Sequence, residues 1–263
     1  MRNAVRKEKS NLLDSYTFQF KNDISSIEIT KELNNPFANA VPEIAKRAAQ
    51  EFQEYITQAS KDWEYDFETQ KGKMFGVLVV ELSDKSLAFL GTVSGTLQGN
   101  SPKQKLVPPI FNESESDAIL SNGLRRLAEL TLEIKQTQAP EKINNLKENR
   151  KQHSIELQKT LFTKTEIINN KGDHKNVLEI FSEVADSYPP AAAGECAAPK
   201  LLQYALKHKL KPVAIAEFWW GNMPKSKARK HSKFYPACKE KCKPILEYIL
   251  DNKDLFLLAN SKD

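Results

Sequence analysis

The sequence predicts an α/β domain in which helices cover a small sheet and a helical hairpin is inserted into the chain. Two apolar, β-branched runs at residues 73–82 and 87–95 flank four polar residues and predict a β-hairpin. Residues 42–57 carry apolar side chains at helical spacing, and residues 117–170 form a long, charged segment with one glycine. The chain has 263 residues, 40% of them apolar, so it can bury a sizeable core.

The first half of the α/β domain is expected at residues 36–116, after a polar N-terminal segment at residues 1–35. Within that segment, the alternation at residues 16–20 is typical of an edge strand or of a segment ordered only against the rest. The helix of residues 42–57 starts with a proline, which suits the first turn, and its broad apolar face predicts packing against the core.

The predicted hairpin is expected to lie at the centre of the sheet, because its nearly continuous apolar character indicates burial on both faces. Gly91 and Gly95 indicate a bulge or a close approach of another part of the chain. Two consecutive prolines at residues 108 and 109 predict that residues 106–111 are an extended connector, since proline donates no backbone hydrogen bond.

Residues 117–170 are expected to form an antiparallel helical hairpin, a coiled-coil arm that projects from the domain. Leucine and isoleucine recur at spacings of three and four, and the chain folds back near Pro140 because an interior proline costs about 3 kcal/mol in a helix. The sparse apolar stripe is equally consistent with a solvated spacer, a dimerisation arm or an arm laid along a large partner.

The second half of the α/β domain is expected at residues 171–263. Turn-forming residues at 169–173 precede a short helix at residues 177–184. A helix after Gly194, a strand at residues 213–220 and a helix after Pro236 follow, and the three cysteines lie in this half.

The composition indicates a protein of the reducing cytoplasm that does not enter a membrane. Three cysteines are an odd number, which excludes a fully paired disulfide framework. No signal-type apolar run follows the first residues, and no run approaches the roughly 20 apolar residues that a transmembrane helix needs. The net charge of +5 is mildly basic, so the distribution of charge is more informative than its total.

The cysteines predict a structural zinc site formed by Cys196, Cys238 and Cys242. Both cysteine segments precede helices, whose N-terminal amides stabilise thiolates. Cys238 and Cys242 are four residues apart, so they share a helix face and suit one tetrahedral zinc. The fourth ligand stays open: water, a substrate atom or His231. The alternative is that all three are reduced, buried cysteines without a metal.

Helix, hairpin, cysteine-first helix, strand and Pro-Ala-Cys helix occur here in the order of the cytidine and tRNA deaminase fold, which the chain resembles. That fold implies a metal scaffold in which a glutamate two residues after the first ligand moves the proton. Here Ala198 holds that position, and the second pair reads Cys-x-x-x-Cys rather than Cys-x-x-Cys. A deaminase reading therefore requires an atypical acid-base residue, and Glu195 and Glu217 are the candidates.

A second resemblance covers most of the chain. Five strings are similar to the long N-terminal extension of some bacterial RluA-type pseudouridine synthases, in the same order and with a charged helical insert between them. They lie at residues 71–80, 106–111, 194–205, 216–221 and 234–242. The resemblance implies tRNA or ribosomal RNA as partner. The His-Arg-Leu-Asp signature of the synthase domain does not occur, so no catalytic residue is assigned and a synthase on a separate chain is a possible partner.

A basic segment surrounds the second cysteine pair. Its predicted RNA-binding residues are Lys225, Lys227, Arg229, Lys230, Lys233, Lys239 and Lys241. Trp219, Trp220, Phe234 and Tyr235 are interleaved with these cations, as in proteins that bind unpaired RNA through phosphates and stacked bases. The alternative is a solvated loop beside core aromatics.

The sequence thus favours a non-catalytic RNA-binding or accessory module linked to RNA pseudouridylation. A zinc-dependent nucleoside or base deaminase and a protein-interaction adaptor are the two alternatives.

Overall fold

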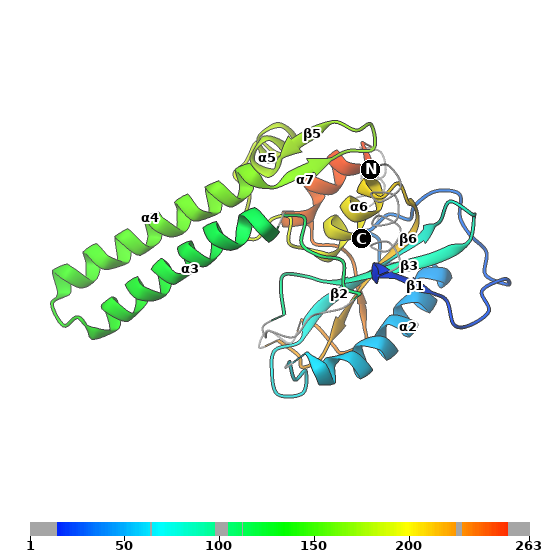
Figure 1. Cartoon of the computed structure of the whole chain (residues 1–263), viewed down its shortest axis with the longest axis horizontal. Helices are drawn as coiled ribbons and strands as arrows, with labels where there is room; N and C mark the ends of the chain where they lie inside the picture. Colours follow the sequence, from blue (N-terminus) through cyan, green and yellow to red (C-terminus); the bar gives the residue numbers. More distant parts are fainter. Residues whose placement is uncertain (1–14, 64, 98–104, 112, 225–227, 252–263) are drawn as a thin grey trace, which may run out of the picture.

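The computed structural model describes residues 15–63, 65–97, 105–111, 113–224 and 228–251. Within these residues the fold is mixed α/β, with six α-helices and a five-stranded antiparallel sheet (Figure 1). In spatial order the strands are β1 (Thr17–Gln19), β3 (Leu87–Val93), β2 (Lys73–Glu81), β6 (Lys211–Trp220) and β7 (Phe234–Tyr235).

Strand β2 lies at the centre of the sheet. It pairs with β3 from Phe75 opposite Val93 to Glu81 opposite Leu87, which confirms the predicted hairpin. On its other side it pairs with β6, with one irregularity after Val79. The predicted edge strand is also confirmed, since β1 pairs with β3 at the border of the sheet.

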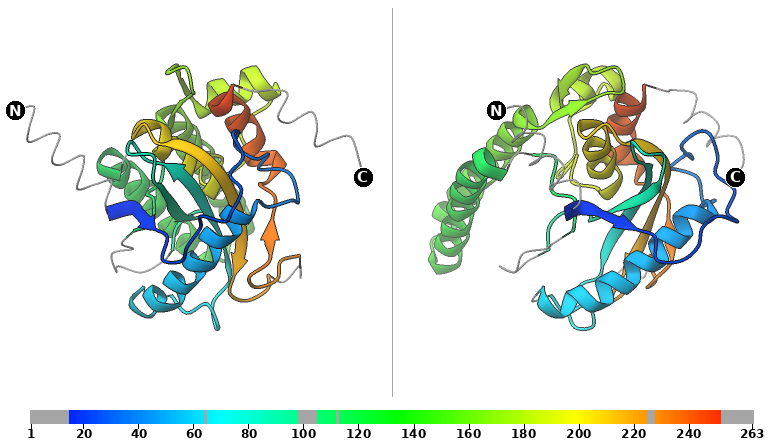
Figure 2. Two further views of the ribbon diagram at one scale, coloured as in Figure 1. Left: turned by 90° about the vertical axis from the view of Figure 1, so that its right-hand side faces the viewer. Right: turned by 45° about the vertical axis from the view of Figure 1, so that its right-hand side comes forward.

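Helices cover both faces of the sheet (Figure 2). Helix α2 (Glu43–Ala59) packs on one face, where Phe52 contacts the aromatic core. A β-carbon at Gly91 would lie 2.3 Å from the Phe52 ring, so the predicted close approach is the contact of this ring with the sheet. The buried Glu51 accepts backbone hydrogen bonds from Lys21 and Asn22 and thereby ties the N-terminal segment to the helix.

Helix α6 (Ala197–Lys207) packs on the opposite face, with α5 (Val177–Ala185) and α7 (Lys239–Leu250) beside it. Gly76 permits this contact, because a β-carbon there would lie 2.8 Å from the β-carbon of Ala197. The N-terminus of α6 therefore sits directly on β2 next to β6, and this position sets the candidate site.

Two long helices, α3 (Glu113–Gln136) and α4 (Pro140–Lys164), lie side by side and extend away from the sheet (Figures 1 and 2). The chain reverses at residues 137–139, where the sequence predicts it, and α3 starts four residues before the predicted position 117. Leu157 packs over Gly123, whose β-carbon would meet it at 2.6 Å. Leu124, Leu132 and Ile155 are exposed, so the seam between the helices is narrow.

A second, two-stranded sheet joins the long helices to α5. Strands β4 (Glu166–Ile168) and β5 (His174–Asn176) flank the predicted turn, in which Asn169 accepts backbone hydrogen bonds from Lys171 and Asp173. The sequence did not predict these strands, because three residues are too few to show alternation. The predicted short helix is confirmed as α5, which Asn176 and Glu179 cap reciprocally.

None of the described helices combines the length and apolar character that crossing a membrane requires.

Candidate metal centre

Cys196 stands at the N-cap of α6, directly after a tight turn. Gly194 adopts a φ of +88°, a left-handed conformation that favours glycine, and turns the chain into the helix. The backbone of the next residue is fixed from outside, because the N–H of Gly95 donates to the carbonyl of Glu195 at 2.7 Å. The helix start and its cysteine are therefore held in place by the end of the central hairpin.

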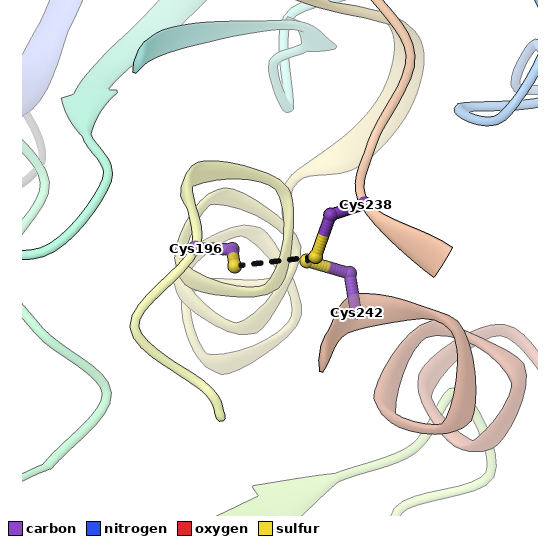
Figure 3. A group of neighbouring side chains, drawn as sticks. All are labelled: Cys196, Cys238 and Cys242. Atoms are coloured by element: carbon purple, nitrogen blue, oxygen red, sulfur yellow. Dashed lines mark hydrogen bonds between the residues drawn. The ribbon is translucent and has the colours of Figure 1, made fainter. Parts of the chain in front are cut away.

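Cys238 stands at the N-cap of α7, so both cysteine helices present their N-termini to one point (Figure 3). The approach to Cys238 is fixed by the N–H of Ala237, which donates to the carbonyl of Pro36 at 2.9 Å. Cys242 follows one turn later and its N–H donates to the Cys238 carbonyl, which closes the first turn of the helix.

The three sulfurs lie together, as the sequence predicts. Sγ of Cys238 is 4.0 Å from Sγ of Cys196 and 3.5 Å from Sγ of Cys242, and all three atoms lie within 4.8 Å of one another (Figure 3). Cys242 is fully buried and the other two are half-buried. The three thiols are close enough to bind one metal ion.

The three thiols differ in acidity: the pKa of Cys238 is lowered, and the pKa values of Cys196 and Cys242 are raised. The pKa of Cys238 falls to about 2, because it accepts hydrogen bonds from Cys196 and Cys242 and is stabilised by amides of the α7 N-terminus. The pKa of Cys196 rises to about 12 through its hydrogen bond to Cys238, and hydrogen bonds to both neighbours together with burial raise the pKa of Cys242. The metal-free cluster therefore holds one thiolate, on Cys238, and two thiols.

A buried carboxyl group stands beside the cluster. Glu217 projects from β6 toward α6, where its Oε1 accepts the N–H of Ala198 at 2.9 Å. Burial is the main cause that raises its pKa to about 7; the Ala198 hydrogen bond opposes this rise, and a charge on Cys238 contributes to it. Strand β6 thus brings a carboxyl group to the start of α6, two residues along the chain from Cys196.

Two other residues considered for the site lie elsewhere: His231, an option for the fourth ligand, and Glu195, a candidate acid-base residue. Nδ1 of His231 accepts the N–H of Gly221 at 3.0 Å and its ring rests on Trp220, so within the described chain the metal-binding group contains no histidine. Glu195 is partly exposed, and its carboxylate lies 4.0 Å from Nζ of Lys200. Of the open choices for the fourth ligand, His231 is therefore not supported, because its ring is held at the end of β6.

Lys200 is a buried cation near the site that the sequence analysis missed. Its ammonium group donates to the carbonyls of Val93 and Gly95, and burial lowers its pKa. The signal was present, because Lys200 follows Cys196 by four residues and so lies on the same side of the predicted helix.

The described part of the basic segment is exposed and carries no ion pair. Lys230, Lys233 and Lys239 are exposed, and Arg229 and Lys241 are half-buried. The Arg229 guanidinium lies 4.3 Å from the centre of the Tyr235 ring. Among the described residues no ion pair is formed by any of these five cations. Lys225 and Lys227 lie outside the described residues.

The aromatic residues of this segment differ in accessibility. Trp219 is buried and its indole N–H donates to the carbonyl of Asn222 at 3.0 Å, so for this residue the alternative of a core aromatic is confirmed. Trp220 is half-buried, and Phe234 packs against the core on the α2 side of the sheet.

Comparison of the chain with family models, with curated proteins and with solved structures finds no match.

Proposed function

We propose that this chain is a non-catalytic RNA-binding module that assists pseudouridine synthesis in tRNA or ribosomal RNA and contains a structural zinc ion. The observation that carries the RNA-binding part is the group of five cations at residues 229–241, none of which forms an ion pair with another described residue. Unpaired cations attract phosphates, whereas paired ones are already neutralised. The link to pseudouridylation rests on the sequence resemblance described above.

Zinc fits the three-cysteine site. At a zinc–sulfur distance of about 2.3 Å, the sulfurs of a tetrahedral site lie roughly 3.8 Å apart. The separations of 4.0 and 3.5 Å bracket this value. Cys196, Cys238 and Cys242 would hold the ion, and it would fasten the start of α7 to the start of α6 on a deaminase-like scaffold.

RNA would lie across the surface formed by β7 and the first turn of α7. Lys239 is exposed in that turn, so its ammonium group is accessible to phosphate. The pairing of Arg229 with Tyr235 holds the guanidinium beside an aromatic ring, an arrangement that also suits unpaired nucleotides.

Replacing Lys230, Lys233 and Lys239 together with glutamine should weaken binding of single-stranded RNA at low salt at least tenfold. The slope of log affinity against log salt should fall by about 2, because each lost phosphate contact on a single strand removes about 0.7. Fluorescence anisotropy with labelled RNA over a salt series measures both quantities.

The matched control is the triple variant Lys46→Gln, Lys85→Gln and Lys151→Gln. It removes the same charge from lysines that already pair with Glu43, Glu81 and Glu148. Equal loss of affinity in both variants would mean that net charge alone explains the weaker binding. It would contradict the assignment of the basic segment as the RNA-binding surface.

The helical pair α3–α4 would serve this module as a coiled-coil arm toward the RNA or a separate synthase chain. Its exposed Leu124, Leu132 and Ile155 support a contact role, since a purely solvated spacer gains nothing from exposed apolar side chains.

One observation favours a second function, hydrolytic deamination of a nucleoside or base. Glu217 is a buried carboxyl group with a pKa of about 7 beside a three-thiol site with no fourth protein ligand in the described group. Such a group suits proton transfer near neutral pH. A bound zinc ion would supply a Lewis acid for water activation.

If this second function holds, the zinc-loaded protein releases ammonia from cytidine, adenosine or an RNA that contains them. Glu217→Gln should then reduce the rate by about 10²- to 10⁴-fold with zinc content unchanged, because general acid-base catalysis contributes that much. Glu195→Gln, at the partly exposed carboxylate nearby, serves as the control. The absence of ammonia release from all three substrates leaves the accessory function alone.

A further inference from the structure

A cavity of about 890 Å³ opens at the end of β6, on the face of the sheet opposite the cysteines. Its walls come from the end of α2, the loop at residues 65–70 and the turn after β6. The volume lies in the range of small-molecule sites. Trp220 and His231 form the aromatic side of this cavity, which we call the Trp220 cavity.

Trp220 is the large aromatic ring that the cavity leaves partly uncovered. The other two rings in the lining, Tyr65 and Phe67, are buried, and the Tyr65 hydroxyl is occupied by the carbonyl of Lys71. The Trp220 ring is half-buried and touches the His231 ring, with 4.2 Å between the centres. A flat ligand that enters can therefore stack on Trp220.

The polar groups of the cavity have defined hydrogen-bonding roles. Nδ1 of His231 accepts the Gly221 N–H, so in the neutral ring the other nitrogen carries the proton and is a donor. Both oxygens of Asp66 already accept hydrogen bonds, from the N–H of Glu68 and the hydroxyl of Thr69, so Glu68 supplies the carboxylate that a ligand would meet. The side chain of Asn222 is held by the carbonyl of Glu68. Carboxylates repel a phosphate but accept the amino groups of cytosine, adenine and guanine.

One cation, Lys61, lines this cavity, and the cations of the basic segment lie just outside it. His231 belongs to the basic segment itself, with Lys230 before it and Lys233 two residues after it. Both lysines are exposed, and neither pairs with an acidic group in the described part of the chain. Phosphates are thus attracted beside the cavity, and the aromatic and acidic lining suits a base within it. A phosphate site beside the cavity and a base site within it suit a nucleotide whose base is turned out of the strand.

We propose that the Trp220 cavity binds one unpaired, amino-bearing base of single-stranded RNA, stacked on Trp220, while the neighbouring lysines hold the adjoining phosphates. The proposal rests on the RNA-binding function proposed above. In this proposal the cavity determines which base is preferred. The basic segment supplies the attraction for RNA phosphates, which does not depend on sequence.

The test is fluorescence anisotropy with oligomers of equal length: oligoadenylate, oligocytidylate, oligouridylate and an abasic ribose phosphate. We expect adenylate and cytidylate to bind about tenfold more tightly than the abasic oligomer, with uridylate between them, since one stacked base has an effect of that size. Trp220→Leu should remove the advantage of every base-bearing oligomer and leave the salt slope unchanged.

Two further variants keep the test independent of folding defects. Glu68→Gln, at an exposed position, should retain stacking and reduce only the preference for adenylate and cytidylate over uridylate. Tyr188→Leu changes an exposed aromatic residue away from the cavity and should alter nothing.

Three outcomes are distinct. Base-dependent affinity that disappears in Trp220→Leu supports the proposal. Equal binding of all four oligomers, with a steep salt slope that the lysine variants abolish, overturns the base site and retains the RNA-binding function. Binding of none of the oligomers overturns both.

Discussion

Cys242→Ser should abolish stoichiometric zinc binding and remove the stabilisation that zinc gives to the fold. The unmodified protein is expected to carry about one zinc per chain, and chelation should lower its melting temperature by about 10 °C. The size of this shift follows from two estimates. A ligand present at about 1,000 times its dissociation constant stabilises the folded state by about 4 kcal/mol. Each kcal/mol changes the melting temperature by about 2–4 °C in a chain of this size. The ion would link the start of α6 to the start of α7, two helices that also pack through their side chains.

The measurement combines metal analysis with thermal unfolding, with and without chelator, in the presence of a reductant. Ala237→Ser is the matched control, because it adds the same hydroxyl group at a neighbouring buried position without removing a sulfur. The control should keep the chelator-dependent shift, and Cys242→Ser should melt at one temperature in both conditions. Metal-free protein whose melting temperature ignores the chelator would identify the cluster as three buried thiols.

The central part of the fold was predictable because its signals are local. Residues 73–95 show two apolar runs with a polar connector, and this pattern alone places the hairpin in the middle of a covered sheet. Strands β4, β5 and β7 contain two or three residues each, and they form because neighbouring elements position them. No alternation of period two extends beyond these short strands. Strand β1 is equally short, but the alternation around it covers residues 16–20 and therefore made it predictable.

The cysteines of the candidate site were predictable, and their chemical surroundings were not. Spacing alone relates Cys238 to Cys242, and two predicted helix starts bring Cys196 to them. The proximity of Glu217 depends on the pairing of β6 with β2, which places Glu217 opposite Gly76 and under the start of α6. The same register decides that Trp219 is buried and Trp220 faces the cavity. The position of Glu217 and the different exposure of the two tryptophans therefore depend on tertiary structure.

Zinc binding should release about two protons near neutral pH, and the affinity should rise about 100-fold for each pH unit, because metal ligands must be deprotonated. Cys238 is already a thiolate, with a pKa of about 2, whereas the raised pKa values of Cys196 and Cys242 keep both protonated in the metal-free cluster. Protons therefore compete at two sulfurs, and the affinity is lost as the pH falls.

Competition with a chromophoric chelator between about pH 6 and 8, together with calorimetry in buffers of different ionisation enthalpy, measures this proton count. The Glu217→Gln variant separates the carboxyl group from the thiols, since the pKa of Glu217 of about 7 lies in the same range. The metal-free site carries a charge of −1, from the single thiolate. The zinc-bound site also carries −1, because three thiolates outweigh the two positive charges of zinc. Glu217 should therefore titrate nearly alike in both states, and the variant should also release about two protons. Release of three protons would mean that Cys238 is protonated without metal, and release of none would mean that the sulfurs do not bind zinc.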